Sequence, residues 1–164
     1  MVAEPPPAVK PGGEGTNPFR LSFPRQKVYK GKMNDFNDDQ NCFVCGGKNT
    51  AGLQLEFTRN AASGETETRV SFPVQFQGWR STVHGGLLAT VLDESMIQAA
   101  GAAGVKCVTA EITVKYRRPA MTGEPCLAAA RVLETRGRVV MAESRICDAQ
   151  GQVLAQATGK LFKV

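Results

Sequence analysis

A short segment between residues 84 and 93 holds the side chains best suited to chemistry. It begins His84-Gly85-Gly86 and ends at Asp93, inside an apolar stretch that predicts a buried helix. A carboxylate in such a helix costs several kcal/mol unless it is paired, so Asp93 is a candidate general base or nucleophile. The alternative is a structural carboxylate that either accepts hydrogen bonds from a neighbouring strand or points to solvent where two elements meet. For Glu94, about 100° around the helix, an interface or structural role is preferred to that of a second acid.

The start of this helix supplies a second chemical element. Free N–H groups and a partial positive charge at a helix N-terminus suit a developing oxyanion, and glycine lets a substrate approach the backbone. Gly85 and Gly86 are therefore candidates to contact a reacting carbonyl, although they also fit a tight helix entry. His84, the only histidine of the chain, is a candidate base, a donor to that carbonyl, or a residue that orients the loop.

The spacing of these groups predicts an oligomer. Gly86 and Asp93 are seven residues apart, which on one helix is about 10 Å at ~1.5 Å per residue. One carbonyl cannot hydrogen-bond to both. If both serve one reaction, they must come from different subunits whose central helices run antiparallel. We therefore predict a homodimer with two composite sites.

Cysteine usage favours a reducing cytoplasm, because the five cysteines are an odd number and are scattered. Cys42-Phe43-Val44-Cys45 resembles half of a zinc knuckle. A structural zinc needs four ligands, however, and the other cysteines stand singly in predicted strands, at Cys107, Cys126 and Cys147. A redox pair would require a βαβ setting that the pattern does not show. The sequence therefore predicts a structural turn at 42–45, with no metal.

Composition narrows the class of protein. The 164 residues suit one domain with a tail, and 42% hydrophobic and 21% charged residues are ordinary for a folded soluble protein. Charged and polar residues interrupt the longest apolar stretch, and the N-terminus lacks a signal pattern, so neither a membrane span nor export is expected. The net charge of +5 suits nucleic acid, an anionic membrane or CoA. Nucleic acid is the least favoured of these, because the basic residues lack interleaved aromatics.

The elements that must position the chemical residues follow from the hydrophobic pattern. Residues 1–41 are expected to form a partly disordered tail, and residues 42–164 the folded domain. One helix is predicted from Gly85/Gly86 to the glycines Gly101 and Gly104. Alternation predicts strands at 53–57, 65–72, 108–117, 125–134, 138–147 and 152–162. Sequential hairpins without a crossover helix favour an α+β fold, in which a curved antiparallel sheet wraps around the helix.

Basic residues stand at the ends of the predicted strands. Arg117 and Arg118 end one strand, and Arg136-Gly137-Arg138 forms a hairpin connection. Fixed positive charges at such positions can bind the phosphates of CoA, with Arg117 or Arg118 preferred. The alternative is the ordinary protection of sheet edges by solvated charges.

The order of elements and the helix-start motif resemble the hotdog thioesterases of the phenylacetate-pathway (PaaI-like) group, within the 4-hydroxybenzoyl-CoA thioesterase superfamily. The resemblance covers about residues 42–164 and includes the 42–46 turn and the strand end Tyr116-Arg117-Arg118-Pro119-Ala120. It implies a hotdog fold, a homodimer or a dimer of dimers, and no cofactor beyond the CoA of the substrate. It also implies that Gly86, helped by His84, polarises the thioester oxygen.

The same resemblance implies that Thr109 helps to hold water beside the acid, although Thr109 also fits as an ordinary strand residue. One departure concerns Gly78, which stands where some relatives carry an asparagine near the acyl carbonyl. Gln75 or Gln77 are the candidate substitutes. Substrate contacts are then expected from Gly85, Arg117, Arg118, Arg136, Gly137 and Arg138.

The predicted function is hydrolysis of an acyl-CoA thioester to a free acid and CoA, with Asp93 of the partner subunit driving attack directly or through water. One alternative is a non-catalytic acyl-CoA-binding or scaffolding module. The other is a hotdog dehydratase, a class that usually carries a Pro-rich loop before the helix, which this sequence lacks. The sequence does not define the acyl chain.

Overall fold

The computed structural model describes residues 38–164, all of which belong to one compact unit, Lys32–Val164. Residues 1–37, which make up most of the predicted tail, lie outside the described residues. In chain order the elements are β1 (Thr58–Arg59), β2 (Thr66–Ser71), a 3₁₀ turn (Val74–Phe76), β3 (Gln77–Trp79), β4 (Thr82–Val83), α1 (Gly85–Ala102), β5 (Cys107–Tyr116), β6 (Pro125–Arg136), β7 (Val139–Cys147) and β8 (Val153–Lys163). The 3₁₀ turn, β3 and β4 were not predicted.

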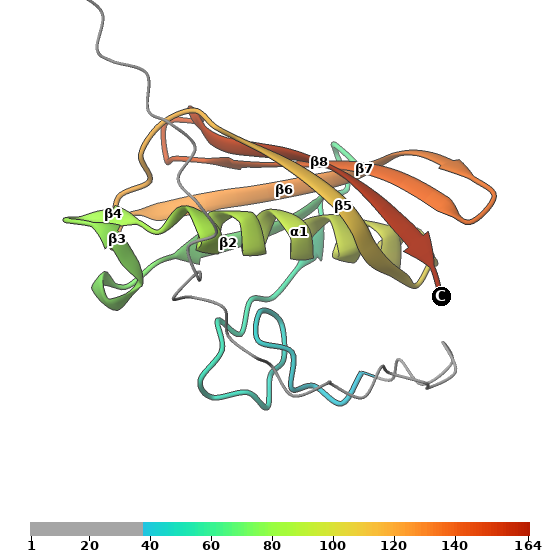
Figure 1. The fold of residues 1–164 in the computed structure, drawn as a ribbon, viewed down its shortest axis with the longest axis horizontal. Coiled ribbons are helices and arrows are strands. Elements are labelled where there is room, and N and C mark those ends of the chain that lie inside the picture. The colour runs from blue at the N-terminus through green and yellow to red at the C-terminus, as the bar shows by residue number, and fades with distance from the viewer. Residues whose placement is uncertain (1–37) are drawn as a thin grey trace, which may run out of the picture. The chain divides into compact units, whose positions relative to one another are not determined.

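The long strands form one antiparallel sheet in the order β1-β2-β6-β7-β8-β5. Strands β6, β7 and β8 are joined by hairpins, whereas β5 pairs with β8 at the opposite edge from β1. Helix α1 runs along one face of the sheet, which curves around it (Figure 1). This arrangement confirms the predicted α+β hotdog fold.

Helix α1 is buried along one side because its apolar residues recur at intervals of three and four. That side consists of Leu88, Val91, Leu92, Ser95, Met96, Ala99 and Ala100. Asp93 and Glu94 lie on the other side of the helix, which is only half-buried. The predicted helix is confirmed, and Gly104, at a φ of 79°, takes the left-handed conformation that commonly follows a helix end.

Within residues 38–164, no helix is both long enough and apolar enough to cross a membrane.

Two features hold α1 against the sheet. The buried hydroxyl of Ser144 on β7 donates a hydrogen bond of 2.9 Å to the carbonyl oxygen of Leu92. Gly159 on β8 leaves room for Met96, because a Cβ at that glycine would lie 2.8 Å from the Met96 Cε. The helix therefore approaches β7 and β8 closely, and its position beside the sheet is specified by polar as well as apolar contacts.

The predicted strand at 53–57 is wrong. The burial alternates as expected, since Leu55 is buried and Gln54 is exposed, but the segment joins no sheet. Gln54 has a φ of 49°, in the left-handed region, which breaks the extended backbone. The N–H groups of Leu53 and Leu55 donate to the carbonyls of Phe43 and Val44 instead. The segment thus packs on the 42–45 turn, and only Thr58–Arg59 pairs with β2.

Strand β5 contains a β-bulge that the sequence pattern did not reveal. Thr109 pairs with Leu161 of β8 and Glu111 pairs with Lys160, so Ala110 has no partner across the ladder. The extra residue reverses the alternation. Thr109 therefore shares a face with Ile112 and Val114, whereas regular alternation would place it on the opposite one.

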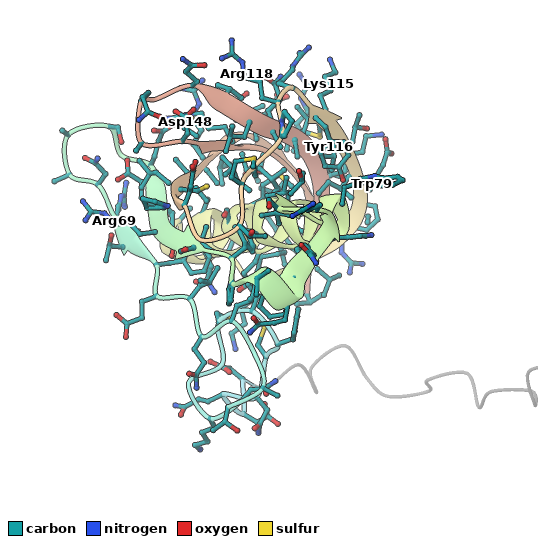
Figure 2. The ribbon with its side chains drawn as sticks, turned by 90° about the vertical axis from the view of Figure 1, so that its left-hand side faces the viewer. Arg69, Trp79, Lys115, Tyr116, Arg118 and Asp148 are labelled. Atoms are coloured by element: carbon teal, nitrogen blue, oxygen red, sulfur yellow. The ribbon has the colours of Figure 1, made fainter. Side chains whose placement is uncertain are left out.

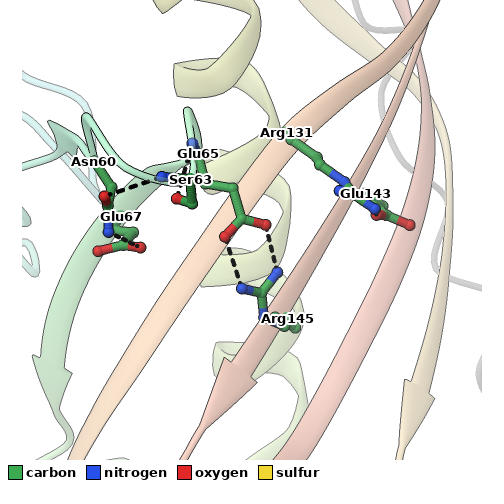
Figure 3. Close-up of polar contacts among 7 residues, drawn as sticks. All are labelled: Asn60, Ser63, Glu65, Glu67, Arg131, Glu143 and Arg145. Carbon is green, nitrogen blue, oxygen red and sulfur yellow. Dashed lines mark hydrogen bonds and ion pairs between the residues drawn. The ribbon is translucent and has the colours of Figure 1, made fainter.

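An ion pair fixes the start of β2 to β7. The guanidinium of Arg145 donates from both terminal nitrogens to the Glu65 carboxylate, at 2.6 and 2.7 Å (Figure 3). The Glu65 side chain is 9% exposed and that of Arg145 is 42% exposed. The hydrogen bonds from Arg145 lower the pKa of Glu65 below its ordinary value, because they favour the charged carboxylate. This bidentate ion pair reaches across β6, which lies between β2 and β7.

Candidate active site

Asp93 and Thr109 form the acid end of the candidate site. Asp93 lies on the half-buried side of α1, and the hydroxyl of Thr109 donates to its Oδ1 at 2.6 Å. The bulge at Ala110 turns Thr109 toward the helix, so this contact depends on the bulge. Partial burial raises the pKa of Asp93 above its ordinary value, the hydrogen bond from Thr109 acts in the opposite direction, and the nearby Glu94 raises the pKa further.

His84, Gly85 and Gly86 form the carbonyl end. His84 caps the helix, because its Nδ1 accepts a hydrogen bond of 3.0 Å from the N–H of Gly86. Accepting at Nδ1 requires that nitrogen to be unprotonated, so the neutral ring carries its proton on Nε2. The Gly86 N–H is thus engaged by His84, and the ring must turn before a substrate oxygen can use it. Among the described residues, the N–H of Gly85 has no acceptor.

Tyr116 belongs to this end of the site, and sequence reasoning missed its role. Its hydroxyl donates to the carbonyl oxygen of Gly85 at 2.9 Å, which ties the last residue of β5 to the first turn of α1. A Cβ at Gly85 would lie 3.3 Å from the Tyr116 ring, so glycine allows the ring to lie against the backbone. The sequence analysis assigned Tyr116 only to the end of its strand, and that position was the one signal that could have suggested a contact with the helix start.

The structure explains the glycine at position 78. A Cβ there would lie 3.2 Å from both the Cα and the Cδ2 of His84, so a larger residue would press on the histidine that caps the helix. The two glutamines considered as substitutes are both exposed. Gln77 uses its side-chain oxygen to accept from the backbone N–H of Ser81, at 3.2 Å, within the turn between β3 and β4.

The two ends of the site do not meet within one chain. Gly86 and Asp93 lie on the same helix, about two turns apart, which corresponds to about 10 Å.

A cavity of about 700 Å³ lies between residues 53–58 and β2, and none of its lining residues belongs to either end of the site.

The basic residues divide into two groups at opposite ends of the sheet. Arg117 and Arg118 follow Tyr116, close to His84–Gly86, and Figure 2 looks onto this end, where Lys115, Tyr116 and Arg118 are labelled. The 136–138 hairpin lies at the other end, because Val139 pairs beside Phe162, which itself pairs with Val108 at the start of β5. Arg136 forms an ion pair with Glu134, and Arg138 donates to the backbone carbonyl of Lys163 at 3.3 Å. Within residues 38–164 of one chain, the two groups of basic residues that the sequence predicted to bind CoA therefore lie apart.

A further group of potential ligands lies next to Asp93. Cys42, Cys45 and Glu94 each bring a sulfur or oxygen atom within 4.8 Å of the others. Burial, together with the neighbouring Glu94 and Cys42, raises the pKa of the Cys45 thiol. The predicted structural turn at 42–45 is present, but the sequence did not indicate that Glu94 would face it.

Comparison with known proteins agrees with this fold. Residues 81–155 match the model of the thioesterase superfamily, and this span contains every residue of both ends of the site. No curated protein matches the sequence. A solved structure described as a thioesterase superfamily protein is 27% identical, with a TM-score of 0.70, over 75% of this chain and 63% of that one. This chain therefore spans less than two thirds of that protein.

Two further solved structures are similar. A Bacillus halodurans protein solved with CoA is 28% identical, with a TM-score of 0.61, over 68% of this chain and 75% of that one. The PaaI protein from the phenylacetic acid degradation operon of E. coli is 19% identical, with a TM-score of 0.61, over 68% of this chain and 80% of that one. Residues 81–155 are thus similar to the thioesterase superfamily model, and the helix packed on a curved antiparallel sheet resembles the fold of the solved thioesterase superfamily protein.

Proposed function

We propose that this protein hydrolyses an acyl-CoA thioester to a free carboxylic acid and CoA. The observation that carries the proposal is the hydrogen bond from Thr109 to Asp93. It occupies Oδ1 of the carboxylate and leaves Oδ2 to accept from a water molecule, while the Thr109 oxygen keeps a lone pair for the same water. A superfamily match and a 28% identical protein solved with CoA support this choice of substrate.

In the proposed reaction, Asp93 removes a proton from water as the water oxygen attacks the thioester carbonyl carbon. Negative charge develops on the carbonyl oxygen, where the N–H groups of Gly85 and Gly86 stabilise it. The C–S bond then breaks, and the CoA thiolate takes up the proton that Asp93 received. The products are the acid and CoA, and Asp93 returns to its charged form.

The geometry requires two subunits in this proposal. Because Gly86 and Asp93 are about 10 Å apart on one helix, the carbonyl held by one subunit is attacked from Asp93 of the partner subunit. An antiparallel arrangement of two α1 helices would also bring the 136–138 hairpin of the partner toward Arg117 and Arg118. The two basic groups that lie apart in one chain would then serve one CoA molecule.

Asp93→Asn tests the proposal against a module that only binds acyl-CoA. Asparagine keeps the size of the side chain and still accepts from Thr109, but it is a much weaker base. Turnover should fall by at least about 100-fold, measured as free thiol released from a panel of acyl-CoA substrates. The affinity for CoA, measured by calorimetry, should stay within about twofold.

Glu111→Gln is the matched control, since Glu111 is an exposed carboxylate paired with Lys160 away from the site. It should leave both quantities unchanged. Full turnover by Asp93→Asn, or wild-type protein that binds acyl-CoA without releasing thiol, would refute the hydrolytic role.

A further inference from the structure

Cys42, Cys45 and Glu94 converge on one point beside α1. Their ligand atoms lie within 4.8 Å of one another, and the Cys42 Sγ is 3.9 Å from the Glu94 Oε2. All three side chains are half-buried. Two come from the turn that precedes the domain's first strand, and the third comes from the helix, 49 residues beyond Cys45 in the sequence. The cluster therefore exists only in the folded chain.

The backbone of the 42–46 turn directs an N–H group at sulfur. The N–H of Val44 donates to the Cys42 Sγ at 3.3 Å, and the N–H of Gly46 donates to the Cys42 carbonyl at 3.0 Å. A Cβ at Gly46 would lie 2.4 Å from the Cys42 backbone nitrogen and 2.5 Å from the Gln40 carbonyl oxygen, so only glycine fits after Cys45. An N–H donor beside a sulfur atom stabilises the thiolate, which is the form that binds metals.

The Glu94 carboxylate is oriented so that one of its two oxygens could act as a monodentate metal ligand. Gln98, one turn further along α1, donates from Nε2 to the Glu94 Oε1 at 2.7 Å, and the other oxygen faces Cys42. A hydrogen bond that holds one carboxylate oxygen while the other faces a cation is typical of groups that support a metal ligand. Within residues 38–164, Glu94 forms no ion pair with a lysine or arginine. A half-buried carboxylate beside two thiols therefore lacks a compensating positive charge.

We propose that Cys42, Cys45 and Glu94 bind a zinc ion, with water in the fourth position. Zinc takes thiolate and carboxylate ligands in a tetrahedron, at about 2.3 Å to sulfur and 2.0–2.2 Å to oxygen. Such a tetrahedron places its ligand atoms about 3.5–3.8 Å apart. The observed 3.9 Å between Cys42 and Glu94 is close to that spacing. Hard cations such as Mg²⁺ are excluded by the two sulfur ligands.

The ion would anchor the 42–55 segment to the helix one residue from Asp93. That segment is held together by hydrogen bonds from Leu53 and Leu55 to Phe43 and Val44, but it joins no strand of the main sheet. The absence of a second cysteine pair led the sequence to predict no metal. The third ligand is instead a helical glutamate, which no cysteine spacing could indicate.

Cobalt binding tests this site directly. The full chain, expressed without an affinity tag and kept reduced, is stripped with a chelator and titrated with Co²⁺. We expect one Co²⁺ per chain, with a thiolate-to-cobalt charge-transfer band in the near ultraviolet and visible bands of tetrahedral cobalt, and loss of these bands when Zn²⁺ is added. Glu94→Gln should weaken binding at least about tenfold, and Cys45→Ser should abolish the charge-transfer band.

Cys147→Ser is the matched control, because Cys147 is a half-buried cysteine on β7 outside the cluster. It should bind Co²⁺ as the wild type does. Zinc at about 100 times its dissociation constant should raise the Tm of the wild type by roughly 5 °C or more, and that of Cys45→Ser by far less. Wild-type protein without a charge-transfer band, or a Cys42→Ser/Cys45→Ser double variant that binds Co²⁺ with wild-type affinity, would overturn the proposal. The cobalt titration of the wild type decides the matter even if a variant fails to fold.

Discussion

Two inactive variants, when combined in one dimer, should restore activity. Asp93→Asn removes the proposed base, and Gly86→Pro removes the N–H that the proposed oxyanion contact needs. Proline is tolerated in the first turn of a helix, where the lost N–H has no helical partner. That N–H instead donates to the His84 side chain, so Gly86→Pro also removes the cap. Each variant alone should therefore retain little turnover.

The expected recovery follows from the geometry of α1. Gly86 and Asp93 are about 10 Å apart on the helix, so in the proposed dimer each site would combine Gly86 of one subunit with Asp93 of the other. In a mixed dimer, one site has both defects and the other has neither. Random exchange of equal amounts makes half of the dimers mixed, and the mixture should therefore reach about a quarter of wild-type kcat.

The assay measures thiol release before and after the two purified variants are unfolded together and refolded. Gly86→Ala is the control, because alanine keeps the N–H and its Cβ would lie 3.0 Å from the His84 Nδ1, on an exposed ring that can shift. It should retain most of its activity. If the refolded mixture is no more active than the mean of its parents, while each parent shows a native circular dichroism spectrum, the composite-site reasoning is wrong.

Three further predictions concern single contacts. Thr109→Val removes the donor to Asp93 and should lower kcat roughly 10- to 100-fold with little change in KM, whereas Thr109→Ser should recover much of the loss. Equal effects of both substitutions on kcat would contradict a role for the hydroxyl. Tyr116→Phe breaks the bond to Gly85 and should lower kcat/KM about 2- to 10-fold while the free energy of unfolding changes by less than about 1 kcal/mol; unchanged kinetics would remove Tyr116 from the site. Glu65→Gln should lower the free energy of unfolding by about 2 kcal/mol at pH 7, a value reduced for the 42% exposure of Arg145. Because the pKa of Glu65 is lowered in the folded state, its contribution is present above the unfolded pKa and is lost as the pH falls through the folded pKa. The difference in urea unfolding between wild type and variant should therefore be largest near neutral pH and shrink as the pH falls below the ordinary pKa of a glutamate, and a difference that does not shrink on acidification would show that the ion pair is not its source.

The amino-acid sequence was sufficient for the features that depend on local periodicity. The helix at Gly85–Ala102 and the strands β2 and β5–β8 were predicted because apolar residues at intervals of three and four, or of two, define one buried face along each element. The ordering of these elements without a crossover helix was enough to predict the antiparallel sheet around one helix. The separation of Gly86 and Asp93 also followed, since a helix has a constant rise per residue.

Only the tertiary structure decided the features that depend on distant hydrogen-bonding partners. Leu53–Phe57 alternates like a strand, but its N–H groups pair with the 42–45 turn, because alternation defines which side chains face inward and not where the backbone pairs. The unpaired Ala110 is visible only in the register against β8, and it turns Thr109 toward Asp93. Glu94 faces Cys42 and Cys45 because the chain returns 49 residues later as a helix beside them. The sequence thus identified the acid and the helix start, and the register and packing of the folded chain determined their neighbours.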